Sequence, residues 1–118
     1  MVSLNMGKTI YILSDEDIDF NVTSRIGNYA CGFIRNGKFR VQYVGRSDTD
    51  LNDRLKDYVV TYKRFKYSDT PSVLAAWRKE CENYHDFEGS IDNKIHPGRP
   101  EGYSKKEYPC NARVTCND

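Results

Sequence analysis

The chain has 118 residues, which is enough for one domain with a small hydrophobic core. Its formal net charge is +1 at pH 7, so the bulk charge carries no information about partners, whereas the distribution of charge does. No apolar run is long enough for a transmembrane helix, and the opening residues lack the charged and apolar zones of a signal peptide. These features exclude an integral membrane protein built from helices and predict a cytoplasmic one.

The N-terminal half contains a short predicted strand followed by separate acidic and basic segments. Residues 9–13 form an apolar run that predicts a strand, and the acidic residues at 15–19 predict a loop or a short helical turn. Five basic residues and no acidic ones follow over the next stretch: Arg25, Arg35, Lys38, Arg40 and Arg46. Such a segment can attract phosphates, although a solvated strand face is the simpler interpretation of the pattern by itself.

Two β-prone segments, residues 29–34 and 39–44, are joined by a turn that contains Asn36-Gly37. Asn-Gly between two such segments is the strongest short-range signal for a β-hairpin. Side chains alternate along a strand, which predicts two sets that each share a face: Tyr29, Cys31 and Phe33 on the first strand, and Phe39, Val41 and Tyr43 on the second. Tyr29 and Tyr43 could therefore meet on one side of the sheet.

The second strand leads into a predicted helix from about residue 50 to residue 62. Gly45 lies where the strand ends, and a glycine there allows a sharp turn or the close approach of a ligand. Thr49 or Asp50 can cap the helix, along which apolar residues recur at helical spacing. Arg54 lies one turn into this helix, so Tyr43 and Arg54 can face the same cleft.

A basic and aromatic link over residues 63–67 leads to a second predicted helix. This helix opens at Thr70-Pro71 and ends near residue 86. Beyond it, prolines and glycines interrupt any regular pattern, so residues 94–118 are expected to form an ordered loop or a tail held by a metal. The elements together predict a single α+β domain over residues 1–118, with a small central antiparallel sheet flanked by helices in a sandwich-like arrangement.

Two short motifs give the chain a resemblance to a known family. Gly27-Asn28-Tyr29, the hairpin, Tyr43-Val44-Gly45 and the downstream Arg54 resemble the GIY-YIG nuclease domain, over residues from about 27 to 93. The second helix of that family carries a glutamate that is followed by an asparagine, and Glu80 and Asn93 fill those places here. Asn28 stands where the family usually has an aliphatic residue.

The resemblance implies a metal-dependent endonuclease that hydrolyses DNA phosphodiester bonds, with flap or branched DNA among the expected substrates. Glu80 would hold one Mg²⁺ or Mn²⁺ ion, because such ions prefer carboxylate oxygens. Tyr29 and Tyr43 would orient or deprotonate the attacking water. Arg54 would clamp the scissile phosphate with its planar fork, and Asn93 would support the site by hydrogen bonding. The expected contacts to nucleic acid are Arg25, Arg40 and Arg46.

Each of these residues also has a purely structural interpretation. The tyrosines could be core aromatics with their hydroxyls at the rim, and Arg54 could lie on a solvated helix face. Glu80 shares an apolar stripe of its helix, so its carboxylate needs a partner, which either an ion pair with Arg54 or a metal would supply. The alternative function is therefore a catalytically inactive GIY-YIG-like module that binds nucleic acid or a protein.

A second set of side chains has the chemistry of a structural metal site. Cys81 and His85 are four residues apart and project from the same side of the predicted helix, and His96 lies between them and the two tail cysteines. Three thiolates and one imidazole would make a closed tetrahedral zinc site from Cys81, His85, Cys110 and Cys116. Such a site would pin the tail to the helix. In the alternative, Cys81 is a small buried apolar residue and His85 is half exposed.

Overall fold

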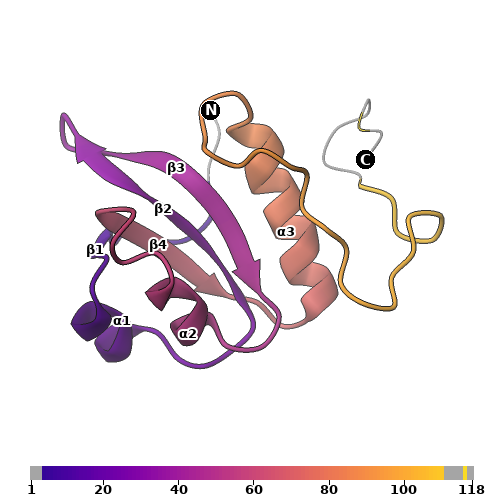
Figure 1. Ribbon diagram of the computed structural model, residues 1–118, viewed down its shortest axis with the longest axis horizontal. Coiled ribbons are helices and arrows are strands. Elements are labelled where there is room, and N and C mark those ends of the chain that lie inside the picture. Colours follow the sequence, from indigo (N-terminus) through magenta and orange to yellow (C-terminus); the bar gives the residue numbers. More distant parts are fainter. Residues whose placement is uncertain (1–3, 111–115, 117–118) are drawn as a thin grey trace.

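The computed structural model describes residues 4–110 and residue 116. Within them the chain forms a small α+β domain with a four-stranded antiparallel sheet and three helices (Figure 1). The elements in chain order are β1 (Tyr11–Ile12), α1 (Asp15–Asn21), β2 (Gly27–Arg35), β3 (Lys38–Ser47), α2 (Leu51–Lys56), β4 (Arg64–Asp69) and α3 (Val73–Asp86). The expected antiparallel sheet flanked by helices is confirmed at this level.

The helices cover the two faces of the sheet unequally. The strand order is β1-β4-β2-β3, so β3 is an edge strand and β2 lies inside the sheet. Helices α1 and α2 bury Ile18, Leu51 and Leu55 against Tyr29 and Phe65 on one face. Helix α3 lies against the other face, next to β2 and β3 (Figure 1). Successive residues of β2 therefore point alternately towards α2 and towards α3.

The predicted hairpin is confirmed, including its turn. Asn36 and Gly37 adopt positive φ angles of 53° and 74°, as a two-residue turn with the twist of a hairpin requires. The predicted common face of Phe39, Val41 and Tyr43 is wrong. Tyr43 packs in the core beneath α2, whereas Phe39 and Val41 pack on the other side of the sheet.

A β-bulge is the reason for this change of face. Cys31 pairs with Tyr43 and Gly32 pairs with Val41, so Gln42 is an extra residue on β3. One extra residue shifts the alternation of side chains by one position, and every side chain beyond it changes face. The bulge thus brings Tyr43 to the same side as Tyr29, although the predicted partners of Tyr43 do not accompany it.

Helix boundaries differ from the predictions at both ends. The acidic segment forms a full helix, α1, whose first turn is capped by the Ser14 hydroxyl. Asp50 rather than Thr49 caps α2, which ends at Lys56 and continues only as turns. Helix α3 begins after Ser72, whose hydroxyl accepts a hydrogen bond from the Ala75 amide, and not at Thr70-Pro71. Side-chain capping sets each N-terminus by satisfying free backbone N–H groups.

The basic and aromatic link is a strand, which corrects the sequence prediction. Residues 64–69 form β4, which pairs with both β1 and β2. Its Phe65 is fully buried and stacks on Tyr11 at 5.1 Å between ring centroids. The predicted strand at 9–13 is reduced to the two residues of β1 at the sheet edge. In the described part of the chain, no helix is long and apolar enough to cross a membrane.

Candidate functional site

Four tyrosines meet beneath α2 and form a tyrosine cluster: Tyr29, Tyr43, Tyr58 and Tyr62. The ring centroids of Tyr29 and Tyr43 are 6.4 Å apart, and Tyr58 lies 5.5 Å from the first and 5.2 Å from the second. The Tyr29 hydroxyl donates a hydrogen bond to the Tyr58 hydroxyl at 3.1 Å. The two motif tyrosines are therefore neighbours, and Tyr58 joins them. The sequence analysis did not identify the Tyr58 hydroxyl as part of the site.

Gly45 is required by the packing of this cluster. A Cβ atom at Gly45 would collide with the ring and hydroxyl of Tyr29, which lies directly opposite it in the sheet. The glycine of Tyr43-Val44-Gly45 therefore makes room for the other motif tyrosine. The sequence indicated close approach at this position, and the group that approaches is a side chain of the same domain.

Arg54 places a cation beside the tyrosine hydroxyls. Burial lowers the pKa of the Arg54 guanidinium, but the nearby Tyr29 and Tyr58 outweigh it and raise the pKa overall. Burial raises the pKa of Tyr43, the hydrogen bond with Tyr58 and the charge of Glu80 add to it, and Arg54 opposes it. Tyr29, which is 1% exposed, has its pKa raised by burial and by Tyr58. Both motif hydroxyls are therefore protonated at neutral pH, while Arg54 is charged and exposed.

Glu80 forms an ion pair with Arg46. The sequence analysis had suggested Arg54 as its partner. Arg46 Nη1 lies 2.6 Å from Glu80 Oε1, and Arg46 Nε lies 2.8 Å from Asp48 Oδ1. The Arg46 and Glu80 side chains are 12% and 13% exposed, so the pair is largely buried. Burial raises the pKa of the Glu80 carboxyl, and Arg46 offsets only part of this effect. The same pairing raises the pKa of Arg46 despite its burial.

Glu80 lies on the opposite face of the sheet from the tyrosine cluster. Helix α3 carries it on the side of Val44 and Arg46, while Tyr43 faces α2. Its charge nevertheless raises the pKa of Tyr43, and Arg54 lowers the pKa of Glu80. The three groups therefore influence one another electrostatically, but the structure brings together Tyr29 and Tyr43 on one face and Glu80 and Arg46 on the other.

Asn93 binds the exposed edge of β3 next to this site. Its side chain accepts a hydrogen bond from the Val44 amide at 3.0 Å and donates one to the Val44 carbonyl at 2.8 Å. The neighbouring Asp92 amide donates to the Gln42 carbonyl at 2.6 Å. Residues 92–93 thus continue the hydrogen bonding of the edge strand from Gln42 to Val44.

Asn28 lies away from the tyrosines. It is fully buried beneath α3, where its amide donates to the Ala76 carbonyl at 2.9 Å and its carbonyl accepts from the Thr70 hydroxyl at 2.7 Å. An aliphatic side chain would leave the Thr70 hydroxyl without this bond. The departure from the family motif at this position is a packing feature of the α3 side.

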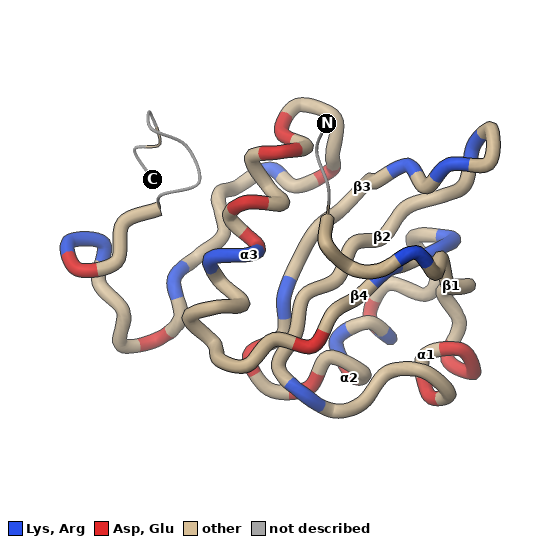
Figure 2. Tube along the Cα trace, turned by 180° about the vertical axis from the view of Figure 1, so that it is seen from behind, with Lys and Arg blue, Asp and Glu red and all other residues tan. Residues whose placement is uncertain are grey.

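The basic residues of the hairpin segment do not form one patch. Arg25 is exposed just before β2, whereas Arg35, Lys38 and Arg40 are exposed at the far tip of the hairpin, which is seen as blue segments in Figure 2. Arg46 is engaged by Glu80 and Asp48. Of the three expected nucleic-acid contacts, Arg25 and Arg40 present exposed cations at opposite ends of the sheet, and Arg46 does not.

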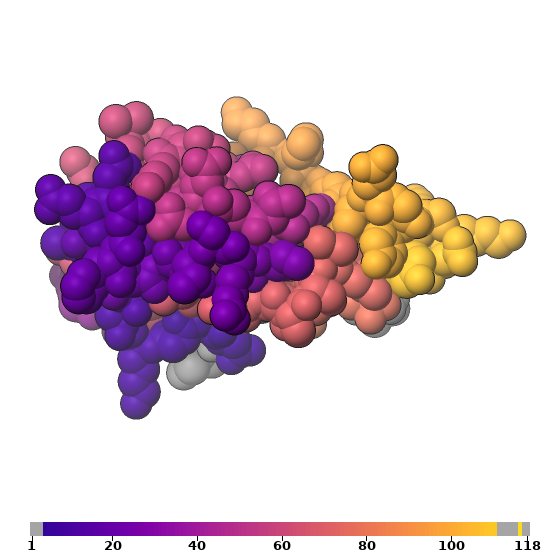
Figure 3. Space-filling model, turned by 90° about the horizontal axis from the view of Figure 1, so that it is seen from below, coloured from indigo at the N-terminus to yellow at the C-terminus, as the bar shows by residue number. Residues whose placement is uncertain are grey.

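A second group of side chains, the histidine–cysteine cluster, lies at the C-terminal end of α3. Its members are His85, His96, Cys110 and Cys116, whose ligand atoms all lie within 4.8 Å of one another, so the cluster could bind a metal. His96 takes the place predicted for Cys81, which corrects the expected ligand set. Cys81 is 2% exposed and packs with Trp77 and Cys110. The segment around the cluster forms one end of the molecule, orange to yellow in Figure 3.

Each imidazole of this cluster is oriented by an oxygen on its far side. His85 Nε2 lies 3.6 Å from Cys110 Sγ, and its Nδ1 lies 2.9 Å from Glu88 Oε1. His96 Nε2 lies 3.5 Å from Cys116 Sγ, and its Nδ1 lies 3.0 Å from the Pro97 carbonyl. An acceptor at Nδ1 fixes the tautomer that leaves Nε2 with a free lone pair. Tetrahedral zinc, with bonds of about 2.3 Å to sulfur and about 2.05 Å to nitrogen, would separate the two atoms by about 3.6 Å.

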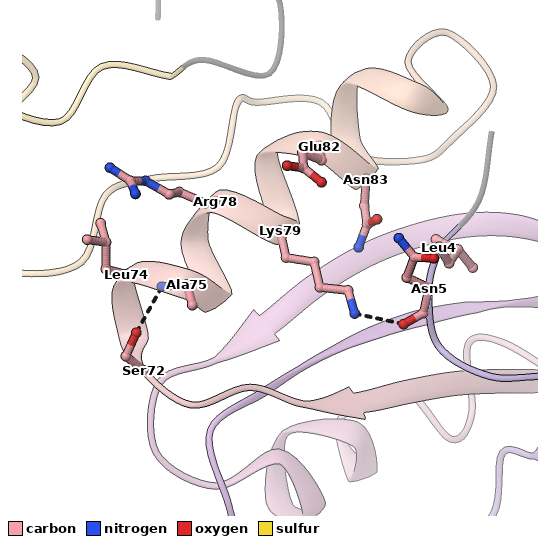
Figure 4. A pocket seen from close by; sticks show the side chains of 9 residues that line it. All are labelled: Leu4, Asn5, Ser72, Leu74, Ala75, Arg78, Lys79, Glu82 and Asn83. Carbon is pink, nitrogen blue, oxygen red and sulfur yellow. Dashed lines mark hydrogen bonds between the residues drawn. The ribbon is translucent and has the colours of Figure 1, made fainter.

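A hollow between α3 and the N-terminal segment carries no comparable chemistry. It is lined by Ser72, Arg78, Lys79 and Asn83 and by the N-terminal segment at Asn5 (Figure 4). The Lys79 amine is directed to the Asn5 carbonyl at 2.9 Å and also contacts Ser68. Burial lowers the pKa of Lys79. The amine thus ties the N-terminal segment to α3.

No family model, curated protein or solved structure matches the chain. The functional interpretation therefore depends on the residues themselves. The β3 end combines protonated hydroxyls, an exposed guanidinium and a buried carboxylate, which suits binding a phosphate and orienting water. The histidine–cysteine cluster offers two nitrogen and two sulfur ligands, which suits a closed metal site.

Proposed function

We propose that the protein is a metal-dependent endonuclease that hydrolyses DNA phosphodiester bonds through a GIY-YIG-like site. The observation that carries the proposal is the arrangement at the β3 end. Tyr29 and Tyr43 pack together with Arg54 beside them on one side of the strand, and Glu80 pairs with Arg46 on the other side, so the motif residues gather at this strand from both faces of the sheet. Branched or flap DNA is the expected substrate class.

The residues have distinct parts in this mechanism. Arg54 binds the scissile phosphate, because its guanidinium is exposed, charged and able to contact two oxygens. Tyr43, which is half-buried, holds and orients the water by hydrogen bonding, since its raised pKa keeps the hydroxyl protonated, and the buried Tyr29 positions this group through its packing on Tyr43 and its bond to Tyr58. Asn93 keeps β3 in place through Val44. These parts supply positioning and electrostatic stabilisation, the main contributions to phosphodiester cleavage.

Glu80 is the residue that fits a Mg²⁺ or Mn²⁺ ion. Carboxylate oxygen is the preferred ligand of such ions, and one or two protein carboxylates are enough for magnesium. Glu80 and Asp48 both contact the Arg46 guanidinium, so an ion bound by Glu80 would have to share the carboxylate with Arg46 or replace it there. When bound, the ion would supply positive charge that offsets the charge building on the phosphate.

A zinc ion at the histidine–cysteine cluster belongs to the same proposal as a structural component. Four protein ligands close such a site and leave no position for substrate, which distinguishes it from a catalytic zinc centre. We expect the bound ion to make the C-terminal segment more ordered.

The alternative function, an inactive module that binds nucleic acid or a protein, is favoured by one specific observation. The Arg46–Glu80 ion pair satisfies the buried carboxylate without any metal. In that case Glu80 stabilises the contact between α3 and β3, and the tyrosine cluster is part of the core.

Substitution of Glu80 decides between these functions. Plasmid, nicked, flap and branched DNA are incubated with the protein and Mg²⁺ or Mn²⁺, with and without chelator. Glu80→Gln should lower cleavage at least about 100-fold and leave DNA binding largely intact. Glu82→Gln is the matched control, because Glu82 is exposed two residues further along the same helix. Arg54→Ala should lower both cleavage and binding.

Two results would contradict the proposal. If Glu80→Gln cleaves as well as wild type, Glu80 does not hold the catalytic metal. If wild type cleaves none of these substrates with either metal, the binding-module function takes the place of the nuclease.

A further inference from the structure

The loop after α3 is attached to the sheet at one end and to the helix at the other. At the sheet, Asn93 and Asp92 bind the outer edge of β3, and the Tyr62 hydroxyl donates to Asp92 Oδ2 at 2.8 Å. At the helix, the Pro97 carbonyl accepts from Trp77 Nε1 at 3.2 Å. We call residues 92–97 the strap, because they connect the edge of β3 to α3.

The histidine–cysteine cluster closes this strap. His85 lies in the last turn of α3 and His96 lies within the strap, so an ion held by both would join the ends of the intervening loop. Cys110 and Cys116 complete the ligand set from the tail. The two Nε2–Sγ distances match the about 3.6 Å of a tetrahedral zinc site, and both imidazoles present Nε2 to the shared centre.

We propose that these four side chains hold a zinc ion and that the ion keeps Asn93 on Val44, so that metal at one end of the molecule fixes the strand of the candidate active site. A loop without regular structure loses conformational entropy when it is held in one position. Closing it at His85 and His96 removes part of that cost before Asn93 binds. The link to DNA cleavage rests on the proposed nuclease function, whereas the zinc site and its effect on Val44 do not.

The ligand set is tested first, by metal content. Purified full-length protein should contain about one zinc per chain, and cobalt substitution should give the visible absorption of a tetrahedral thiolate site. His96→Ala and Cys116→Ser should lose the metal. Cys81→Ala is the matched control and should retain it, since Cys81 packs beside the cluster without belonging to it. Loss of zinc from Cys81→Ala with retention in His96→Ala would overturn the set.

A variant that leaves all four ligands in place sharpens this test. Glu88→Gln weakens the acceptor at His85 Nδ1 and should lower zinc affinity about 10-fold or more, with the fold unchanged by circular dichroism. In the alternative, the Cys110 and Cys116 thiols donate hydrogen bonds to the imidazoles and no metal is bound. Purified protein that contains no zinc and does not respond to chelator would overturn the site.

The coupling is tested by hydrogen exchange at the Val44 amide. This amide donates to Asn93 Oδ1 and not to β2, so its protection reports on the strap. Chelation of zinc should speed its exchange about tenfold, the equivalent of one hydrogen bond. In Asn93→Ala the exchange should already be fast and chelation should add nothing. Unchanged exchange in chelated wild type would overturn the coupling and leave the zinc site in place.

Cleavage separates this inference from the proposed function. If the protein is a nuclease, chelation followed by addition of excess Mg²⁺ should leave cleavage lowered, and re-addition of one equivalent of zinc should restore it. If the protein cleaves no DNA, the metal content and Val44 exchange still decide the zinc site and its coupling.

Discussion

The tyrosine cluster and the histidine–cysteine cluster are built in opposite ways. The tyrosines belong to the largest hydrophobic core, where rings on strands and the α2 segment contact one another and the hydroxyls bond within the group. In the second cluster only His85 lies in a helix, and the other three members lie in irregular chain. Core packing positions the first group, whereas the members of the second come mostly from irregular chain, where the proposed zinc would hold them together.

This difference has a consequence for function. Side chains fixed by packing are preorganised, which a catalytic site requires, but substituting them also changes stability. Side chains held by a metal can be released by removing the ion, without emptying the core. The proposed catalysis therefore lies at the cluster that packing holds fixed. The proposed structural zinc lies at the cluster that a metal ion can hold.

The largest expected effect tests whether packing holds the tyrosine side. Phe65→Ala removes a fully buried ring that contacts Tyr11 and Tyr67, and it should lower the free energy of unfolding by about 3–5 kcal/mol. Urea denaturation with and without chelator should give the same loss, because Phe65 belongs to a different packing cluster from Cys110.

Phe20→Ala provides the control for this substitution. Phe20 is 89% exposed on α1, so its removal should change stability by less than about 0.5 kcal/mol. A loss at Phe65 that depends strongly on chelator would mean that the two clusters are not independent.

The sequence predicted the parts of the molecule that are encoded locally. Asn36-Gly37 determines its own turn, and the hairpin and the antiparallel sheet followed from it. Strand β4 was missed because Arg64, Lys66 and Ser68 made the segment read as a link. The alternation of Phe65 and Tyr67 with these polar residues was the available signal.

The rest depended on contacts between distant residues. No periodicity places His96, since the path of an irregular loop is set by what it binds. The choice of Arg46 over Arg54 as partner of Glu80 depends on how α3 lies on β3. The bulge at Gln42, which determines the face of Tyr43, likewise has no signal in the alternation of residue types.

A smaller effect tests the assignment of Asn28 to the α3 side. Asn28→Ala removes two buried hydrogen bonds and should cost about 1–3 kcal/mol in the free energy of unfolding. Cleavage per folded molecule should not change, because the side chain faces away from Tyr29. A double-mutant cycle with Thr70→Val should give a non-zero coupling energy. Loss of cleavage in a folded Asn28→Ala protein would place this residue in the site after all.

The smallest effect concerns the ionisation of Tyr29 and tests the tyrosine cluster at alkaline pH. Burial, followed by the hydrogen bond with Tyr58, raises the pKa of Tyr29 in the folded protein. The unfolded chain therefore loses this proton first, so the contribution of Tyr29 is fully present below pH ~10 and declines as pH rises above it. At pH ~10.5 the decline should be about 0.8 kcal/mol. Tyr29→Phe has no such proton, so its stability difference from wild type, measured by urea denaturation at pH ~7 and ~10.5, should shrink by that amount. A difference that stays constant over this range would mean that the Tyr29 hydroxyl is open to solvent, and the packed construction of the cluster would then be wrong.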